Sequence, residues 1–301
     1  MEATDRSEVA ELICVSLNYW LQMRGRPPGF PGGPATTDAF FEVYEALDPG
    51  CGVVAVNEKT GRLAGSCFYH PRPTHVSLGI MNVHPNYFGQ GVAKALLGYI
   101  IEYADREKKP VRLVSSAMNL ESFSLYTRAG FVPRCAYQDF FLRVPDEGLE
   151  HHTPGLENVR EATDDDVEAM VALEMELSGI RREKDFHYFL KNSDGLWHTS
   201  VYENDQGGLD GFMVSSGHEG LNMIGPGMAR TEEQALPLML VELDRHRGGT
   251  PVFVVPVECD RIVRRMYDLG GRNYELHFGQ IRGPAEPIRG VNVPTFLPES
   301  G

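Results

Sequence analysis

The chain alternates between segments in which apolar residues follow helical spacing and short apolar runs typical of strands. Helical spacing governs the first 24 residues, where the apolar positions are Val9, Leu12, Ile13, Leu17 and Leu21. A second helix is expected over 39–47, with Thr37 or Asp38 as its N-cap. Proline and glycine in the segment between the two helices, 24–34, disfavour both helix and strand.

Strand and helix patterns then alternate. Apolar runs predict strands over 52–57, 63–70, 76–84, 111–117 and 135–144. Helical spacing returns over 91–106 and 120–129.

A similar order of elements follows a segment of linker composition. Thr163 is expected to cap a helix that begins at the acidic run 164–166 and ends near Leu177. The remaining expected elements are strands at 197–203, 209–216, 221–224, 251–257 and 274–282, and helices at 231–247 and 260–269. This repetition predicts a duplicated α/β unit with a mixed sheet: a first domain over 1–145, a linker over 146–158, and a second domain over 159–301 with an extended tail from 283.

Composition narrows the possible functions. The 301 residues carry 42 acidic and 28 basic side chains, a net charge of −14 that repels a nucleic acid backbone. No apolar run approaches the roughly 20 residues of a membrane span, and the acidic N-terminus does not resemble a signal peptide. The five cysteines are far apart and form no CxxC pair, so neither disulfides nor a metal site is expected. A cytoplasmic protein is expected, and a homodimer is left open.

A glycine-rich turn at 88–94, between a strand and a long helix, is suited to binding an anion. Such a turn directs backbone N–H groups to one spot at the positive end of a helix dipole. The dinucleotide fingerprint fails because Lys94 stands at its third glycine, and no GK[ST] of a P-loop follows. A purely structural turn remains an alternative to a coenzyme A site.

A second segment, Asn119 to Phe131, resembles a hallmark of the GNAT acetyltransferase superfamily, N-x-x-[AS]-x-x-L-Y-x-x-x-G-F, at every marked position. The earlier turn is similar to that family's V-x-P-x-[aromatic]-[RQ]-[GN]-x-G-x-[GA], except that Phe88 stands where Arg or Gln is usual. The resemblance is strong over 53–144 and faint in the second half. It implies a tandem GNAT fold, two copies of a splayed mixed β-sheet flanked by helices, with acetyl-CoA as the cofactor.

The resemblance also implies roles for individual residues. The main chain of Asn82 and Val83 is expected to pair with the pantetheine arm as an added strand would. Asn119 is expected to hydrogen-bond the same arm, and Tyr126 to protonate the leaving thiolate. The pyrophosphate is expected to bind the backbone N–H groups of Phe88, Gly89, Gln90, Gly91, Val92 and Ala93, and Lys94 is expected to add positive charge.

The general base is not evident in the sequence. The strand at 76–83 contains no Asp or Glu. Nearby acid–base candidates are expected to be solvated surface residues: His70, His75, Glu42 and Glu45. His84, beside Pro85, is expected to be structural. The segment 24–31 is either an acceptor-binding loop or a flexible connector.

The second copy lacks the cofactor pattern. Pro226 removes an N–H donor, and Glu232 opposes a phosphate at the start of the corresponding helix. Tyr267 echoes the L-Y signature and is expected in the core, while the charged run 181–185 is expected to be a solvated turn. The leading hypothesis is an N-acetyltransferase acting on a primary amine of a small or amino-acid-like acceptor. The alternatives are a non-catalytic acyl-CoA sensor and a protein lysine or N-terminal acetyltransferase.

Overall fold

The computed structural model describes residues 1–149, 153–218 and 222–299, and the chain divides into two compact units. Unit 1 comprises Met1–Pro71, His75–Val111 and Phe296–Glu299. Unit 2 comprises Arg72–Thr74 and Arg112–Thr295 among the described residues. These units are defined by contacts, and the division of the sequence into copies at 1–145 and 159–301 stays a prediction.

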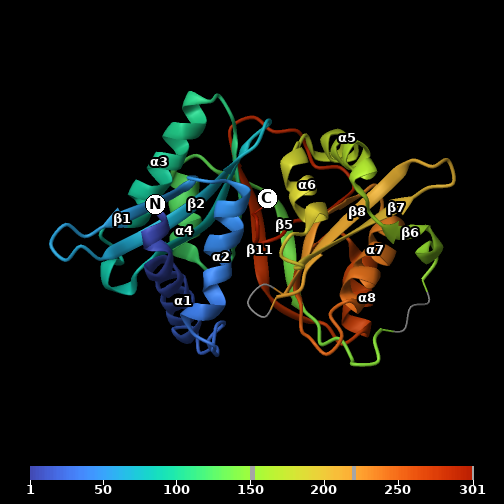
Figure 1. Cartoon of the computed structure of the whole chain (residues 1–301), viewed down its shortest axis with the longest axis horizontal. Helices are drawn as coiled ribbons and strands as arrows, with labels where there is room; N and C mark the ends of the chain where they lie inside the picture. Colours follow the sequence, from blue (N-terminus) through green and yellow to red (C-terminus); the bar gives the residue numbers. More distant parts are fainter. Residues whose placement is uncertain (150–152, 219–221, 300–301) are drawn as a thin grey trace. The chain divides into compact units, whose positions relative to one another are not determined.

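Unit 1 is an antiparallel sheet with three helices. Its strands follow one another in the sheet as they do along the chain: β1 (Gly52–Val56), β2 (Leu63–Pro71) and β3 (Val76–Val83). Its helices are α1 (Arg6–Gln22), α2 (Pro34–Leu47) and α3 (Val92–Arg106). Helices α1 and α2 lie side by side (Figure 1).

Helix α2 begins five residues before the expected position, so the prediction of Thr37 or Asp38 as its N-cap is wrong. Gly33 is the N-cap and Pro34 takes the first helical position, where its missing N–H is not needed. The buried Thr37 hydroxyl instead donates to the carbonyl of Ala10 at 2.7 Å.

A β-bulge interrupts β3. Cys67 pairs with Met81 and Tyr69 with Leu78, so Gly79 and Ile80 together face a single residue of β2, Phe68. A Cβ on Gly79 would lie 2.9 Å from the carbonyl oxygen of Phe68, which explains a glycine here.

Helix α3 packs closely on β2 because the strand has a glycine beneath the first turn of the helix. A Cβ on Gly65 would lie 2.7 Å from Cγ1 of Val92. Since Gly65 also pairs with Val83, the strand, the following loop and the helix start are held in one fixed arrangement.

Unit 2 is a mixed sheet flanked by helices, which confirms the predicted fold class. Its strands lie in the order β4-β11-β5-β10-β9-β8-β7-β6, and β12 pairs with β9. Their bounds are β4 (Val111–Ser116), β5 (Val132–Phe141), β6 (Val159–Glu161), β7 (Trp197–Glu203), β8 (Leu209–Ser216), β9 (Met223–Ala229), β10 (Val252–Pro256), β11 (Arg272–Arg282) and β12 (Val291–Val293). The helices are α4 (Leu120–Arg128), α5 (Val167–Ser178), α6 (Glu183–Lys191), α7 (Glu232–Asp244) and α8 (Asp260–Asp268).

Strands from the two sequence halves interleave in unit 2. β5 lies beside β11 (Figure 1). It also pairs with β10 on its other edge and is antiparallel to both, with Phe141 opposite Arg272 and Val252. β9 and β10 are parallel and pair at Met223 and Val252. Buried apolar side chains from β5, β9, β10, α7 and α8 share one core cluster.

The expectation for the charged run 181–185 needs correction. The charged run 181–185 is not a solvated turn, because Arg182 and Asp185 are buried. Nε of Arg182 donates to Glu174 at 2.9 Å, and Nε of Arg72 donates to Asp185 at 2.9 Å, so each buried charge has a partner of opposite sign.

The tail, which is expected to be extended, contains the strand β12. A strand is also expected at 221–224. Residue 221 lies outside the described residues, and the observed strand, β9, runs from Met223 to Ala229. Residues 150–152 of the expected linker and 300–301 of the tail also lie outside the described residues.

Candidate functional site

The loop after β3 is built from overlapping turns that begin at His84. Nδ1 of His84 accepts from the backbone N–H of Asn86 at 3.2 Å and caps a short 3₁₀ helix, Pro85–Tyr87. His84 is therefore structural, as expected. The N–H groups of Phe88 and Gln90 then bond back to the carbonyls of Pro85 and Tyr87.

Two glycines with left-handed backbone conformations set the course of the chain at the end of this loop. Gly89 and Gly91 have φ angles of +74° and +84°, a region that residues with a Cβ adopt only at a cost. A Cβ at either position would meet no atom within 4 Å, so the space beside both is open. Gly91 is the N-cap of α3 and provides no side-chain cap.

The first turn of α3 presents backbone donors to this open space. The N–H groups of Val92, Ala93 and Lys94 have no intrahelical acceptor by geometry, and the N–H of Ala95 donates to the carbonyl of Gly91 at 3.0 Å. The helix dipole adds partial positive charge at the same place, and the exposed Lys94 adds a full one. The arrangement is chemically suited to a phosphate group.

The side chains of Phe88 and Gln90 in this loop contact other groups of the protein. Phe88 is 50% exposed and makes an edge-to-face contact with Tyr19 at 5.9 Å between ring centroids. Nε2 of Gln90 donates to the carbonyl of Asn86 at 3.0 Å. The loop therefore offers an anion mainly its backbone.

Asn82 and Val83 end the strand that leads into this loop. The Asn82 side chain is buried, and its Oδ1 accepts from the Ser16 hydroxyl of α1 at 2.7 Å. Val83 pairs with Gly65 of β2. The segment Asn82 to Lys94 is thus one continuous strand, loop and helix start within unit 1.

Asn119 and Tyr126 lie together on α4 in unit 2. Oδ1 of Asn119 caps the helix by accepting from the N–H of Ser122 at 3.1 Å. Gly130, at φ +91°, ends the helix, and the N–H of Phe131 returns to the carbonyl of Tyr126. Tyr126 is 7% exposed and its ring packs against Phe131. Local helix geometry thus accounts for the asparagine and glycine of the motif.

Helix α8 of the second copy begins and ends in the same way as α4, but with different side chains. The N–H of Gly271 returns to Met266 as that of Phe131 returns to Tyr126, and Cys259 takes the N-cap position of Asn119. The counterpart of Tyr126 is therefore Met266, and the motif has the same spacing in both copies. Tyr267 is 47% exposed, so its expected place in the core is wrong; the residue before it fills the core.

The start of α7 also differs from that of α3. Thr231 is its N-cap and forms a capping box with Gln234, whose side chain accepts from the Thr231 N–H at 3.0 Å. Glu232 and Glu233 follow in the first turn. Side chains thus engage the N–H groups of Thr231 and Gln234 at the start of α7, whereas α3 has no side-chain cap.

The expectation that His70 and His75 are solvated is wrong, because both are buried in unit 1. Nδ1 of His70 lies 2.7 Å from Asp48, and its Nε2 lies 3.6 Å from Glu299. Glu299 also accepts from the Tyr44 hydroxyl at 2.6 Å. Glu299 is more than two hundred residues away in sequence, so no local pattern could have revealed this group.

Glu42 and Glu45 remain peripheral, as expected. Glu42 is exposed and forms an ion pair with Arg6, and Glu45 accepts from the N–H of Gly50 at 3.1 Å.

A second group missed by the sequence analysis lies on β5 and β11. Asp139, Glu275 and His277 each bring one potential metal-ligating atom within 4.8 Å of the others. Glu275 pairs with Asp139 across the two strands, so the three side chains share one face of the sheet. Burial lowers the pKa of His277 to about 4. The spacing of these residues in the sequence follows no metal-binding motif, so this group comes from strand pairing alone.

Residues 17–131 match the model of the Acetyltransferase (GNAT) family. A curated relative, the UPF0157 protein YqkA of Bacillus subtilis (strain 168), is 29% identical over 103 residues, which are 34% of this chain and 29% of that protein. The chain thus spans less than a third of that relative's length.

Solved structures share the fold over nearly the whole chain. A GCN5-related N-acetyltransferase from Sphaerobacter thermophilus has a TM-score of 0.62 at 18% identity, covering 97% of this chain and 96% of that one. A tandem GNAT protein from the clavulanic acid biosynthesis pathway has a TM-score of 0.59 at 15% identity, covering 94% and 97%. Among the described residues, no helix combines the length and apolar character needed to cross a membrane.

The motifs on α3 and α4, the match over 17–131 and the shared fold agree. Residues 17–131 belong to the acetyltransferase (GNAT) family, in a chain that has the fold of tandem GNAT proteins.

Proposed function

We propose that the chain transfers an acetyl group from acetyl-CoA to a primary amine of a small or amino-acid-like acceptor by direct transfer. The observation that carries this proposal is the open helix start at Gly91. Gly89 and Gly91 have positive φ angles with open space beside them, and α3 has no side-chain cap. Family membership supports acyl transfer from coenzyme A. The acceptor class rests on the chain's net charge of −14, which favours a cationic amine over an acidic substrate.

The proposed site assigns each part of the cofactor to residues of this chain. The segment Phe88 to Lys94 holds the pyrophosphate, chiefly through the N–H groups of Val92, Ala93 and Lys94 in the first turn of α3. The main chain of Asn82 and Val83 pairs with the pantetheine arm. The amide nitrogen of Asn119 donates to the same arm. When bound, the cofactor supplies an acetyl thioester, whose C–S bond breaks as the C–N bond to the amine forms. Tyr126 would donate a proton to the departing sulfur, and the proton that the amine nitrogen loses would pass through water back to the tyrosinate, since β3 carries no carboxylate to accept it.

Binding at Gly91 is tested by calorimetry with acetyl-CoA. We expect Gly91→Glu to abolish binding, because it places a carboxylate against the phosphates. Gly61→Glu is the matched control, since Gly61 also has a positive φ, +69°, and open space around it, but lies in the β1–β2 turn. Equal affinity in the two variants would refute the site.

A non-catalytic acyl-CoA sensor is the second candidate, favoured by the absence of Asp and Glu from β3. Release of coenzyme A thiol across a panel of amines and peptides separates the candidates. Turnover on small amines supports the enzyme proposed here, and turnover only on peptides indicates a protein acetyltransferase. Tight binding without turnover on any acceptor supports the sensor.

A further inference from the structure

The C-terminal tail forms a strand where the second copy, by its correspondence with the first, would bind a pantetheine arm. In the first copy the bulge at Gly79 and Ile80 is followed by Met81, Asn82 and Val83, the last two proposed to pair with the cofactor. In β9, Met213 pairs with Gly227 and Ser215 with Ile224, so Gly225 and Pro226 form the corresponding bulge. The residues after that bulge are Gly227, Met228 and Ala229.

β12 pairs with those three residues and no others of β9. Val293 lies opposite Gly227, Asn292 opposite Met228, and Val291 opposite Ala229, in antiparallel register. A strand here satisfies the backbone groups that an added pantetheine arm would satisfy.

Glycines fit the tail closely at both ends of this pairing. A Cβ on Gly225 would lie 2.8 Å from the carbonyl oxygen of Pro294, and one on Gly290 would collide with the carbonyl oxygen of Ala229. The tail is also attached before the strand, where the N–H of Arg289 donates to the carbonyl of Leu177 at 2.7 Å.

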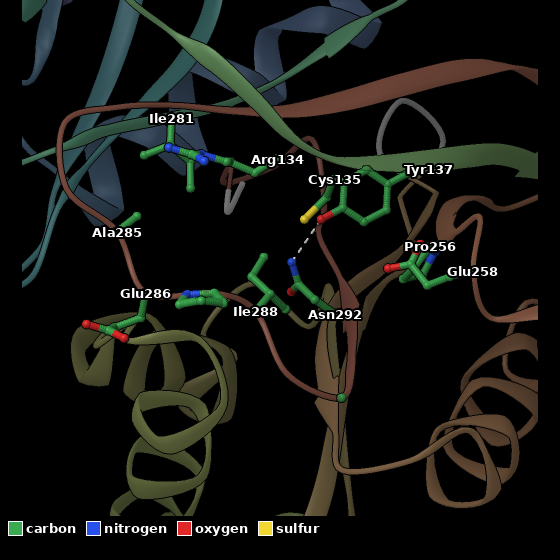
Figure 2. Close-up of a pocket in the computed structure, with 12 residues that line it drawn as sticks. Arg134, Cys135, Tyr137, Pro256, Glu258, Ile281, Ala285, Glu286, Ile288 and Asn292 are labelled. Carbon is green, nitrogen blue, oxygen red and sulfur yellow. Dashed lines mark hydrogen bonds between the residues drawn. The ribbon is translucent and has the colours of Figure 1, made fainter.

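The side chains of β12 are buried in unit 2. Val291 is 3%, Asn292 2% and Val293 0% exposed. Nδ2 of Asn292 points at Tyr137 of β5 and donates to its hydroxyl at 3.1 Å (Figure 2). The pocket left beside β12 has a volume of about 290 Å³, at the lower limit for enclosing a small ligand.

We infer that β12 is an internal substitute for the pantetheine arm and closes the second copy to cofactor. The inference rests on the proposed function, because it takes the role of β9 from that of β3. It predicts that one chain binds one acetyl-CoA, and that the ladder at Gly227–Ala229 accepts a pantetheine-class ligand only when β12 is displaced.

The test displaces β12 in the full chain with Val293→Asp, which puts a charge at a fully buried position. Val257→Asp is the matched control, since Val257 is 41% exposed in the same unit. We expect the amides of Gly227–Ala229 to exchange hydrogen at least about tenfold faster in Val293→Asp only. Millimolar pantetheine, or a synthetic peptide of residues 289–295, should slow this exchange again.

Pantetheine that leaves exchange at Gly227–Ala229 unchanged in Val293→Asp would overturn the inference, as would two acetyl-CoA per unmodified chain in calorimetry. If Val293→Asp does not fold, the stoichiometry of the unmodified chain decides: one supports the inference and two overturns it. If no acetyl-CoA binds at all, the proposed function fails, and the exchange experiment with pantetheine alone decides on β12.

Discussion

The two copies have similar backbones but different side chains at the helix starts and at the tyrosine position of the motif. Gly91 leaves the start of α3 open, whereas Thr231 and Gln234 close the start of α7 with their side chains. Tyr126 and Met266 occupy the same place on α4 and α8, but only the tyrosine has a proton to donate. A few side chains thus distinguish two copies whose backbones are alike at these positions.

At this scale we expect Tyr126→Phe to lower kcat by about 100-fold or more, a typical loss for a general acid, with little change in acetyl-CoA affinity. The measurement is steady-state release of thiol at saturating cofactor. Tyr267→Phe is the control, because this tyrosine lies on α8 and is 47% exposed. Equal kcat in both variants would remove Tyr126 from the mechanism.

Elements are held at their ends by capping groups that are readable in the sequence. Thr163 and Asp166 form a capping box at the short 3₁₀ helix that precedes α5, as the acidic run predicted. The Asp166 carboxylate also accepts hydrogen bonds from both terminal nitrogens of Arg160, each at 2.8 Å. The guanidinium holds the pKa of Asp166 below its usual value.

A depressed pKa in the folded state fixes the pH dependence of this cap. Its stabilisation is fully present above the unfolded-state pKa of about 4 and is lost as pH falls through the lower, folded-state pKa. We therefore expect Asp166→Asn to destabilise the fold by about 1 kcal/mol at pH 7 and progressively less below pH 4. Thermal unfolding across this range measures the difference. Asp165→Asn, an exposed neighbour, should show no such pH-dependent loss, and similar curves for both variants would exclude the cap.

Across the molecule, strands from both halves of the sequence form one sheet within unit 2. β5, from the first half, has β10 and β11 of the second half as its neighbours. Its backbone groups and the Phe140 ring, buried against Phe253, therefore depend on residues beyond 145.

This pairing predicts that residues 1–145 expressed alone do not form a stable domain, because β5 would lose both partners. Co-expression with 146–301 should restore a folded complex. Far-UV circular dichroism and size-exclusion chromatography distinguish these outcomes. A monomeric, cooperatively folded 1–145 fragment would show that the first copy is independent of this pairing.

The sequence by itself determined the elements and the family, because both depend on neighbours along the chain. The period of the apolar positions, together with the turn residues, located most helices and strands to within a few residues. The motifs at 83–93 and 119–131 lie on the loop and helix they predicted. Their glycines and asparagine are explained by local φ angles and caps.

Tertiary structure decided what depends on partners distant in sequence. The burial of His70 beside Asp48 and Glu299, the pairing of Arg182 with Glu174, and the place of β12 on β9 follow from contacts across the fold. A charged side chain is equally polar in sequence whether it faces water or a buried partner, and a three-residue strand carries too little pattern to reveal its neighbour. Only folding brings those partners together, and with them the closure of the second copy.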